Sequence, residues 1–394
     1  MAKSLFDKTY IGKMKLKNRI FMSPMGTTGE ADGAYCNEGI DYFEERAKGG
    51  AGLIITGANV VSTKYEPRPC TELSDFHHVE RLNMLIERCH AYGAKVCVQL
   101  SPGLGRQQFT DPFTPPYSAG SVGAFWFPDL ICKPFSKEDI HYLVEKVGYS
   151  ASLAVNAGAD CVELHAYGGY LLDQFHSVQW NNRTDEYGGS FENRIKYPMD
   201  VLKTVIDEVN GEVPVQIRVS VDEYVDDGMK FEEVKTVCHI AKEMGVASIS
   251  LSAGCYDAVE YAIQPMFIPQ GFIIPFAKEL KAEIDIPVIV AVRLNDAHLI
   301  ENVVENDEAD IVAIGRGLIA DSLLIDKIKA HDYDYIRYCI ACNQGCIDRV
   351  LGGMPAHCMV NPVAGEELTC KLKGKSDKKV VIIGAGPAGM EAAI

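Results

Sequence analysis

The sequence predicts an α/β protein built around a closed (β/α)8 barrel of parallel strands, and three observations support this fold class. Short apolar runs alternate with helical patterns over most of the 394 residues, which indicates parallel strands joined by helices. The alternation yields eight strand-then-helix units, the number that closes a barrel. A long polar and aromatic segment, residues 165–194, follows the fourth strand, where α/β proteins place their chemistry. An open doubly wound sheet is the alternative, and only the count of units favours closure.

The expected elements follow from the spacing of apolar residues. The strands are short and apolar, as buried parallel strands are, and comprise residues 20–23, 53–61, 96–100, 160–164, 215–219, 248–252, 287–292 and 311–314. The helices show a 3.6-residue period and comprise residues 39–48, 77–92, 137–157 with Ser136 as the N-cap, 197–209, 231–244, 272–283, 296–305 and 323–330. Residues 101–135 are rich in Gly, Pro and aromatics without any period, which predicts an insertion that covers a site.

The pattern changes after the eighth unit, and the changes suggest domain boundaries. We expect the barrel to occupy residues 1–335 and a cysteine-rich segment to occupy residues 336–365. A polar, lysine-rich linker spans residues 366–378, and residues 379–394 resemble the start of a Rossmann-type dinucleotide-binding domain.

Composition excludes several classes of partner. The formal net charge of −16 argues against binding to nucleic acid or to an anionic membrane. No run approaches eighteen apolar residues, and the first residues lack an apolar secretory core, so we expect a cytoplasmic protein. The thirteen scattered cysteines favour thiols and metal ligands over a disulfide framework.

Arginines follow the last two expected strands. Arg293 follows the seventh strand, and Gly315 and Arg316 follow the eighth. Barrel enzymes bind phosphate at this place, helped by helix N-terminal amides. Gln99 ends the third strand and Arg218 the fifth, so both should reach the same end of the barrel.

Four cysteines form the motif C-x2-C-x3-C-x11-C, at Cys339, Cys342, Cys346 and Cys358. Cysteines grouped so closely predict a metal site. Structural zinc usually pairs two C-x2-C knuckles, whereas iron–sulfur clusters accept uneven spacing. We therefore expect a [4Fe–4S] cluster, with zinc or inert thiols as alternatives.

A GxGxxG motif, at Gly384, Gly386 and Gly389, follows the apolar residues 380–383. An expected strand before the motif and a helix after it provide the context that binding of a dinucleotide pyrophosphate requires. The acidic ribose ligand expected about twenty residues later lies beyond residue 394. We expect this stretch to be loosely ordered or packed on the barrel, and not to bind FAD alone.

Two motifs carry a resemblance to a known family. HAYGGYLLDQF, which begins at His165, is followed by NNRTDEYGGSFENR, which ends at Arg194. Together they resemble the signature of the old yellow enzyme family of flavoprotein ene-reductases. CIACNQGC and the later CMVNP are similar to the iron–sulfur branch, which includes 2-enoate reductases, 2,4-dienoyl-CoA reductases and trimethylamine dehydrogenase. The resemblance covers residues 1–394.

The resemblance implies roles for individual residues. His165 would anchor a substrate oxygen, and Tyr170 would donate a proton. Flavin mononucleotide (FMN) would be held by residues at the strand ends: backbone groups of Pro24, Met25 and Gly26 at the ring, Ala58 over it, Gln99 and Arg218 at the pyrimidine side, and Arg293, Gly315 and Arg316 at the phosphate.

The sequence departs from the family pattern at two positions. Many ene-reductases have a second His or Asn three residues after the first, whereas Gly168 stands here. Tyr256 stands where the dienoyl-CoA branch has a histidine that supports the donor. We therefore expect a 2-enoate-type substrate rather than a dienoyl-CoA.

The resemblance implies an ene-reductase in which electrons pass from NAD(P)H through FAD and the cluster to FMN, and then to an activated alkene. Two alternatives stay open: an amine or steroid/bile-acid dehydrogenase on the same scaffold, and an electron-transfer or diaphorase module. We expect a small unsaturated acid, thioester or enone as the partner. Whether the chain forms a homo-oligomer stays open.

Overall fold

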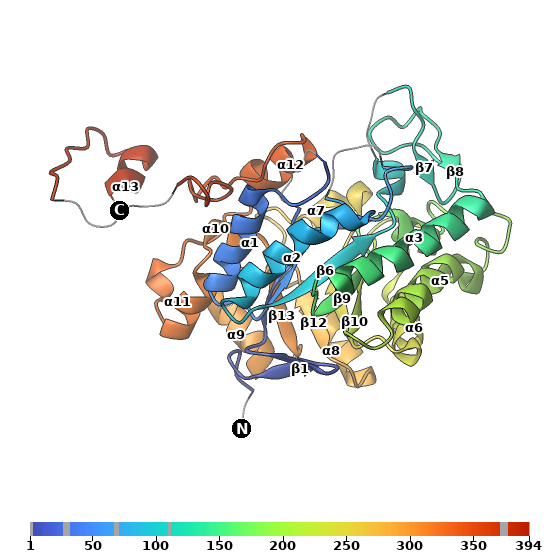
Figure 1. The fold of residues 1–394 in the computed structure, drawn as a ribbon, viewed down its shortest axis with the longest axis horizontal. Helices are drawn as coiled ribbons and strands as arrows, with labels where there is room; N and C mark the ends of the chain where they lie inside the picture. The colour runs from blue at the N-terminus through green and yellow to red at the C-terminus, as the bar shows by residue number, and fades with distance from the viewer. Residues whose placement is uncertain (1–2, 27–31, 67–70, 109–111, 371–376, 394) are drawn as a thin grey trace.

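A closed barrel of eight parallel strands forms the centre of the molecule (Figure 1). The computed structural model describes residues 3–26, 32–66, 71–108, 112–370 and 377–393. Because β4 pairs with both β3 and β6, and β3 also pairs with β13, the sheet closes. This confirms the predicted (β/α)8 class and excludes the open sheet. The barrel strands are β3 (Ile20–Met22), β4 (Leu53–Ile55), β6 (Lys95–Ser101), β9 (Cys161–Ala166), β10 (Val215–Ser220), β11 (Ser248–Ser252), β12 (Val288–Ala291) and β13 (Ile311–Ile314).

Helices surround the barrel on its outside (Figure 1). Ser136 caps the first turn of the longest one by accepting a hydrogen bond from the backbone of Asp139, whose side chain bonds back to Ser136. This capping box confirms the predicted start at residue 137. The main helices are α1 (Asn37–Lys48), α2 (Val79–His90), α3 (Lys137–Asn156), α5 (Phe191–Val209), α6 (Phe231–Met244), α8 (Ile274–Glu283), α9 (Ala297–Glu305), α10 (Arg316–Ala320) and α11 (Leu324–Ala330).

Alternation along the strands divides the core into two layers. In β3, Ile20 and Met22 pack in the large cluster between sheet and helices, whereas Phe21 belongs to a smaller cluster of inward-facing residues, because side chains along a strand alternate between its faces. A hairpin that the sequence analysis did not predict, β1 (Thr9–Ile11) and β2 (Met14–Leu16), adds three apolar side chains to the smaller cluster. It lies at one end of the barrel (Figure 1).

The expected strand 53–61 is wrong as a single element. It divides into β4 and a short β5 (Asn59–Val60), and the chain bends between them. At Gly57, an added Cβ would lie 2.9 Å from backbone atoms of Met25 and Gly26. The close approach of two loops therefore breaks the strand, and local propensity could not reveal it.

The segment 165–194 is more regular than expected. His165 lies inside β9, and a short helix, α4 (Leu171–His176), follows the first loop. Helix α5 begins at Phe191, six residues before the expected start at residue 197, because Ser190 caps it by accepting a hydrogen bond from the backbone of Asn193 (3.4 Å).

The segment after the barrel contains only short helices. A single π-helical turn (Gln344–Asp348) leads into α12 (Arg349–Leu351), and α13 (Pro387–Ala393) ends the described chain. The strand expected at residues 380–383 is not formed, and the side chains of Val381 and Ile383 are 84% and 97% exposed. A strand needs a neighbour to pair with, and no other described strand pairs with this stretch.

Two ion pairs tie parts of this segment down. Arg46 of α1 is fully buried and pairs with Glu367, so the packed chain extends into the expected linker. Arg337 pairs with Glu391 of α13 at 2.9 and 3.0 Å, while α13 itself lies to the side of the barrel (Figure 1). The predicted boundaries at residues 335, 365 and 378 stay predictions.

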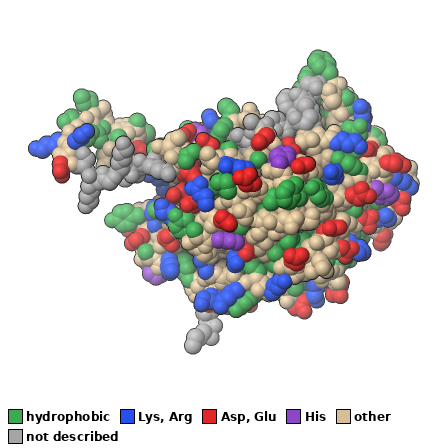
Figure 2. All heavy atoms as spheres, in the orientation of Figure 1, with side chains coloured by type: hydrophobic (Ala, Val, Ile, Leu, Met, Phe, Trp, Pro, Cys, Tyr) green, Lys and Arg blue, Asp and Glu red, His purple; other side chains and the backbone are tan. Residues whose placement is uncertain are grey.

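The surface carries both signs of charge. Acidic and basic side chains are interspersed over the face shown in Figure 2. Among the described helices, none combines the length and the apolar character that a membrane span needs.

Candidate active site

A cavity of about 300 Å³ opens at the carboxyl ends of the barrel strands. This is the end at which barrel enzymes hold their substrates. Its wall contains every barrel residue that the sequence analysis assigned to a site: Pro24, Met25, Gly26, Ala58, Gln99, His165, Tyr170, Arg218, Tyr256, Arg293, Gly315 and Arg316. The structure therefore brings these residues together, whereas their individual roles stay predictions. Gly384, Gly386 and Gly389 lie outside the cavity wall, in the C-terminal segment.

Two guanidinium groups gather at one end of the cavity. Arg316 donates to the backbone oxygen of Gln264 (2.7 Å) and to the side chain of Asn343 (2.5 Å). Burial and the nearby charge of Arg316 lower the pKa of Arg293. Within the described chain, neither arginine forms an ion pair with a carboxylate. Two uncompensated cations fit a phosphate dianion, since guanidinium groups bind phosphate with charge-assisted hydrogen bonds.

Arg218 provides a third cation deeper in the barrel. It donates to the hydroxyls of Ser23 and Ser252, both at 3.2 Å, and lies 4.6 Å from the ring centre of Tyr167. Its Nε is buried and has no hydrogen-bond partner among the described residues. A buried cation with an unused donor fits the electron-rich N1–O2 edge of a flavin, which becomes anionic on reduction.

Glu163 is a site residue that the sequence analysis missed. It is fully buried inside the barrel and accepts hydrogen bonds from the side-chain amides of Gln99 and Gln216, both at 2.6 Å. Because Gln99 donates to Glu163, its carbonyl oxygen is left for the cavity. Burial raises the pKa of Glu163, while the charge of Arg218 lowers it. The signal in the sequence that could have revealed Glu163 is a carboxylate within an otherwise apolar strand.

Three polar aromatic side chains lie together in the cavity wall. The hydroxyls of Tyr170 and Tyr256 are hydrogen-bonded at 2.7 Å, and the ring of His165 lies 4.7 Å from that of Tyr170. Burial, followed by the charge of Arg218, lowers the pKa of His165 to about 3. His165 is therefore neutral at neutral pH and can donate a hydrogen bond without carrying charge.

Two glycines shape the turn that presents Tyr170. Gly168 and Gly169 have φ angles of 80° and 77°, a region that favours glycine. The amide of Gly169 donates to Asp173 at 2.6 Å, which closes the turn. The turn therefore aims the tyrosine hydroxyl into the cavity from the end of β9.

The insertion predicted at residues 101–135 does cover the site. Leu104, Gln107 and Trp126 line the cavity. The insertion contains two very short strands, β7 (Tyr117–Ser118) and β8 (Lys133–Pro134), and residues 109–111 lie outside the described chain.

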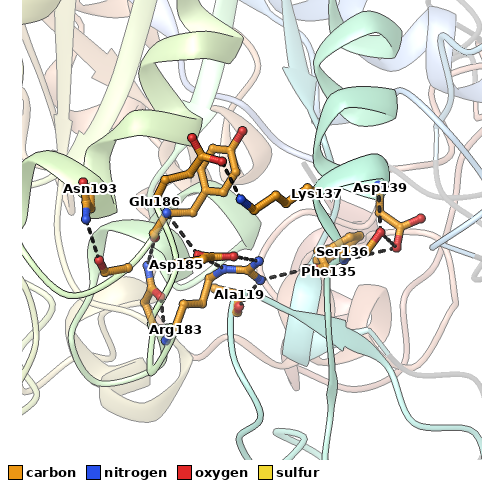
Figure 3. Close-up of polar contacts among 12 residues, drawn as sticks. Ala119, Phe135, Ser136, Lys137, Asp139, Arg183, Asp185, Glu186 and Asn193 are labelled. Carbon is orange, nitrogen blue, oxygen red and sulfur yellow. Dashed lines mark hydrogen bonds and ion pairs between the residues drawn. The ribbon is translucent and has the colours of Figure 1, made fainter.

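Arg183 holds this insertion in place (Figure 3). Its guanidinium forms two hydrogen bonds with Asp185, at 2.9 and 2.6 Å, and donates to the backbone oxygens of Ala119 (3.0 Å) and Phe135 (2.7 Å). The NNRTDEYGG part of the motif is therefore a clamp on the insertion and does not line the cavity.

The four predicted metal ligands, Cys339, Cys342, Cys346 and Cys358, line one small second cavity. Cys339 also borders the large cavity. In the described part of the chain, no three Cys, His, Asp or Glu side chains form a group that could hold a single metal ion. The four thiols border one shared space, and the uneven spacing of the motif suits an iron–sulfur cluster. The cluster stays a prediction.

The closed α/β barrel and the cation-lined cavity at its carboxyl end define a flavin-binding oxidoreductase of the barrel class. The chain belongs to the NADH:flavin oxidoreductase / NADH oxidase family, whose sequence profile matches residues 4–334. Membership supports FMN as the cofactor, and the residues at the strand ends fit its phosphate and pyrimidine groups.

Three similar proteins extend the match beyond the barrel. The chain is 36% identical to cinnamate reductase of Clostridium sporogenes, over 99% of this chain and 62% of that protein. It is also 36% identical to NADH oxidase of Thermoanaerobacter brockii, over 99% of this chain and 61% of that protein. A 2-naphthoyl-CoA reductase structure in complex with 2-naphthoyl-CoA matches with a TM-score of 0.93 at 27% identity, over 100% of this chain and 62% of that one. The chain spans about three fifths of the length of these relatives.

Proposed function

We propose that this chain is the FMN- and [4Fe–4S]-binding part of a flavin-dependent ene-reductase. Its substrate class is an activated alkene: a 2-enoate, an enoyl- or dienoyl-thioester, or a related enone. The observation that supports this best is the Tyr170–Tyr256 hydroxyl pair, at 2.7 Å, beside the neutral His165 in one cavity. The similarity to a cinnamate reductase favours a 2-enoate.

The side chains divide the work as follows. FMN, when bound, supplies the hydride that reaches the β-carbon of the alkene. Tyr170 donates the proton that the α-carbon requires, because a positioned phenol hydroxyl can act as a general acid. Tyr256 hydrogen-bonds the donor hydroxyl and relays to it, after turnover, a proton that solvent water supplies. His165 binds the oxygen that activates the alkene.

An anaerobic reoxidation assay tests the activity. The FMN-loaded protein is photoreduced and mixed separately with an enoate, an enoyl-CoA and a dienone, and the return of oxidised flavin absorbance is followed. We expect fast reoxidation by at least one of the three, with the enoate the fastest. Reoxidation at the buffer rate by all three contradicts the proposal.

The electron supply forms a second part of the proposal. Electrons reach FMN from NAD(P)H through FAD and the cluster in the full-length protein, where Cys339, Cys342, Cys346 and Cys358 bind the cluster. Protein purified without oxygen should contain about four iron and four sulfide per chain. Cys346→Ala should lose both while keeping FMN, and Cys370→Ala, an exposed cysteine outside the set, should keep them. Stoichiometric zinc without sulfide contradicts this part.

An electron-transfer or diaphorase module is the second candidate, and the similarity to an NADH oxidase favours it. In that case the reduced flavin passes electrons to oxygen or a quinone. Reoxidation by a quinone together with inertness towards every alkene would select this candidate. An amine or steroid/bile-acid dehydrogenase is the third candidate, and reduction of FMN by an amine or a steroid tests it.

A further inference from the structure

Gln107 carries an unused hydrogen-bond donor inside the active-site cavity. The residue lies at the end of a short 3₁₀ turn (Gly105–Gln107) in the insertion and is 2% exposed. Among the described residues, its Nε2 has no hydrogen-bond partner. A buried donor left unpaired costs about 1–3 kcal/mol, so this position is expected to have a partner in the working protein.

The orientation of this amide is set by its neighbour, Gln174. The Gln174 oxygen accepts from the backbone N–H of Arg106 (3.2 Å), and its Nε2 donates to the backbone oxygen of Gly169 (2.7 Å). These backbone partners leave only one orientation for Gln174, since an N–H cannot accept and a carbonyl cannot donate. The same Nε2 contacts the side-chain oxygen of Gln107 at 2.9 Å. A flipped Gln107 would place two NH2 groups against each other.

The free donor of Gln107 lies beside the catalytic turn. A Cβ added to Gly169 would lie 2.8 Å from Gln107 Nε2, so only glycine admits this contact. Gln107, His165 and Tyr170 line the same cavity. Among the described residues, the Nδ1 atom of His165 is also buried without a hydrogen-bond partner.

We propose that Gln107 and His165 together bind the substrate oxygen, with Gln107 Nε2 as the second donor. The group that fits is a carboxylate or a thioester carbonyl, because both accept hydrogen bonds from two directions. The inference rests on the proposed function and specifies how that site recognises its substrate. The donor comes from the insertion, so the insertion selects substrates as well as covering them.

Binding to the oxidised, FMN-saturated chain tests the inference without turnover. The probe is cinnamate, titrated while the flavin absorbance is followed. Gln107→Met keeps the size and removes the donor, and should weaken cinnamate binding about 10- to 100-fold, as expected for a hydrogen bond to a charged group. Gln107→Glu should weaken it further by repulsion. β-Methylstyrene, which has the carbon frame without oxygen, should bind the wild type and Gln107→Met equally.

Gln179→Met provides the matched control. Gln179 is an exposed glutamine that does not line the cavity, so this variant, which carries the same change of side chain, should bind cinnamate like the wild type. If the wild type binds cinnamate and cinnamate reoxidises its reduced flavin, an unchanged Kd for cinnamate in Gln107→Met overturns this inference alone. If no alkene reoxidises the reduced flavin of the wild type, the proposed function is overturned, and this inference is overturned with it.

Discussion

The two halves of the signature segment, 165–176 and 181–194, are adjacent in the chain but differ in what they contact. His165 and Tyr170 of the first half line the cavity. Arg183 of the second half does not line the cavity. It donates instead to the backbone oxygens of Ala119 and Phe135 in the insertion (Figure 3). A continuous sequence motif therefore covers two functions: one half supplies the chemistry, and the other fixes the cover over it.

The two halves also differ in the surroundings of their carboxylates and in the direction in which those surroundings shift the pKa. Asp173 is fully buried, faces Glu223 rather than a cation, and burial raises its pKa to about 7. Asp185 is paired with Arg183, whose hydrogen bonds lower its pKa. The clamp half therefore gains stability from its charges, whereas the catalytic half holds a carboxylate in a place that disfavours charge. Active sites commonly retain such costs.

The largest expected effect belongs to the catalytic half. Tyr170→Phe should slow reoxidation of the reduced flavin by an enoate about 10²–10⁴-fold, the usual contribution of a positioned acid. FMN content and flavin reduction should stay unchanged, as should reoxidation by a quinone, which needs no proton at carbon. Stopped-flow absorbance measures each step. If the enoate reacts at the wild-type rate, the proton donor is another group, with Tyr167 and Tyr256 the next candidates.

Substitutions in the second half, residues 181–194, should change the stability of the protein rather than the rate of the enoate step. Arg183→Met removes the donor of two backbone oxygens and leaves Asp185 with only the backbone N–H of Tyr187. It should lower the free energy of unfolding by about 3 kcal/mol. Arg183→Lys should recover only part of this, because lysine cannot form the same fork of hydrogen bonds. Lys203→Met, which breaks an exposed pair with Asp207, should cost less than about 0.5 kcal/mol. Urea unfolding of the three variants provides the comparison. If Arg183→Met has normal stability but reacts slowly with the enoate, the residues 181–194 contribute to the chemistry and not to holding the insertion.

The pH dependence of stability should also distinguish the halves. The folded-state pKa of Asp173 lies above its unfolded value of about 3.9, so its contribution is fully present below about pH 4 and is lost as the pH rises towards 7. Asp173→Asn should flatten this slope, which is at most about 1.4 kcal/mol per pH unit for one proton.

Asp173 is surrounded by further titratable groups, namely Glu223, Asp222 and Cys255. Part of the fall in stability with rising pH should therefore persist in Asp173→Asn, and it should disappear in the double variant with Glu223→Gln. Asp185 acts in the opposite sense, since its lowered pKa gives stability that is lost as the pH falls below about 4. Arg183→Met should flatten only this acid limb. Urea unfolding at a series of pH values checks both, and an unchanged neutral slope in Asp173→Asn would contradict the raised pKa.

The smallest expected effect concerns Tyr256. Tyr256→Phe removes one hydrogen bond to the donor hydroxyl, so the enoate step should slow about 2- to 10-fold, with the stability and the FMN content unchanged. A loss as large as that of Tyr170→Phe in the same stopped-flow assay would mean that Tyr256 itself donates the proton.

The sequence alone was sufficient for the barrel and for the residues around its cavity. Eight alternating units specify closure, and residues at the carboxyl ends of parallel strands must meet at one end of the sheet. The sequence therefore places Gln99, Arg218 and Arg293 in one site. The helix start at residue 137 was equally predictable, because capping by Ser136 is a local interaction.

Features that depend on contacts between distant segments required the tertiary structure. The break between β4 and β5 arises where Gly57 meets Gly26, and the clamp of Arg183 reaches backbone oxygens 48 and 64 positions away. The hydrogen-bond orientations of Glu163 and Gln107 arise in the same way. Periodicity reports which face of an element is buried, but not which polar atom it meets there. For that reason the sequence indicates where the site lies, while the packed structure decides which donors within it remain unused.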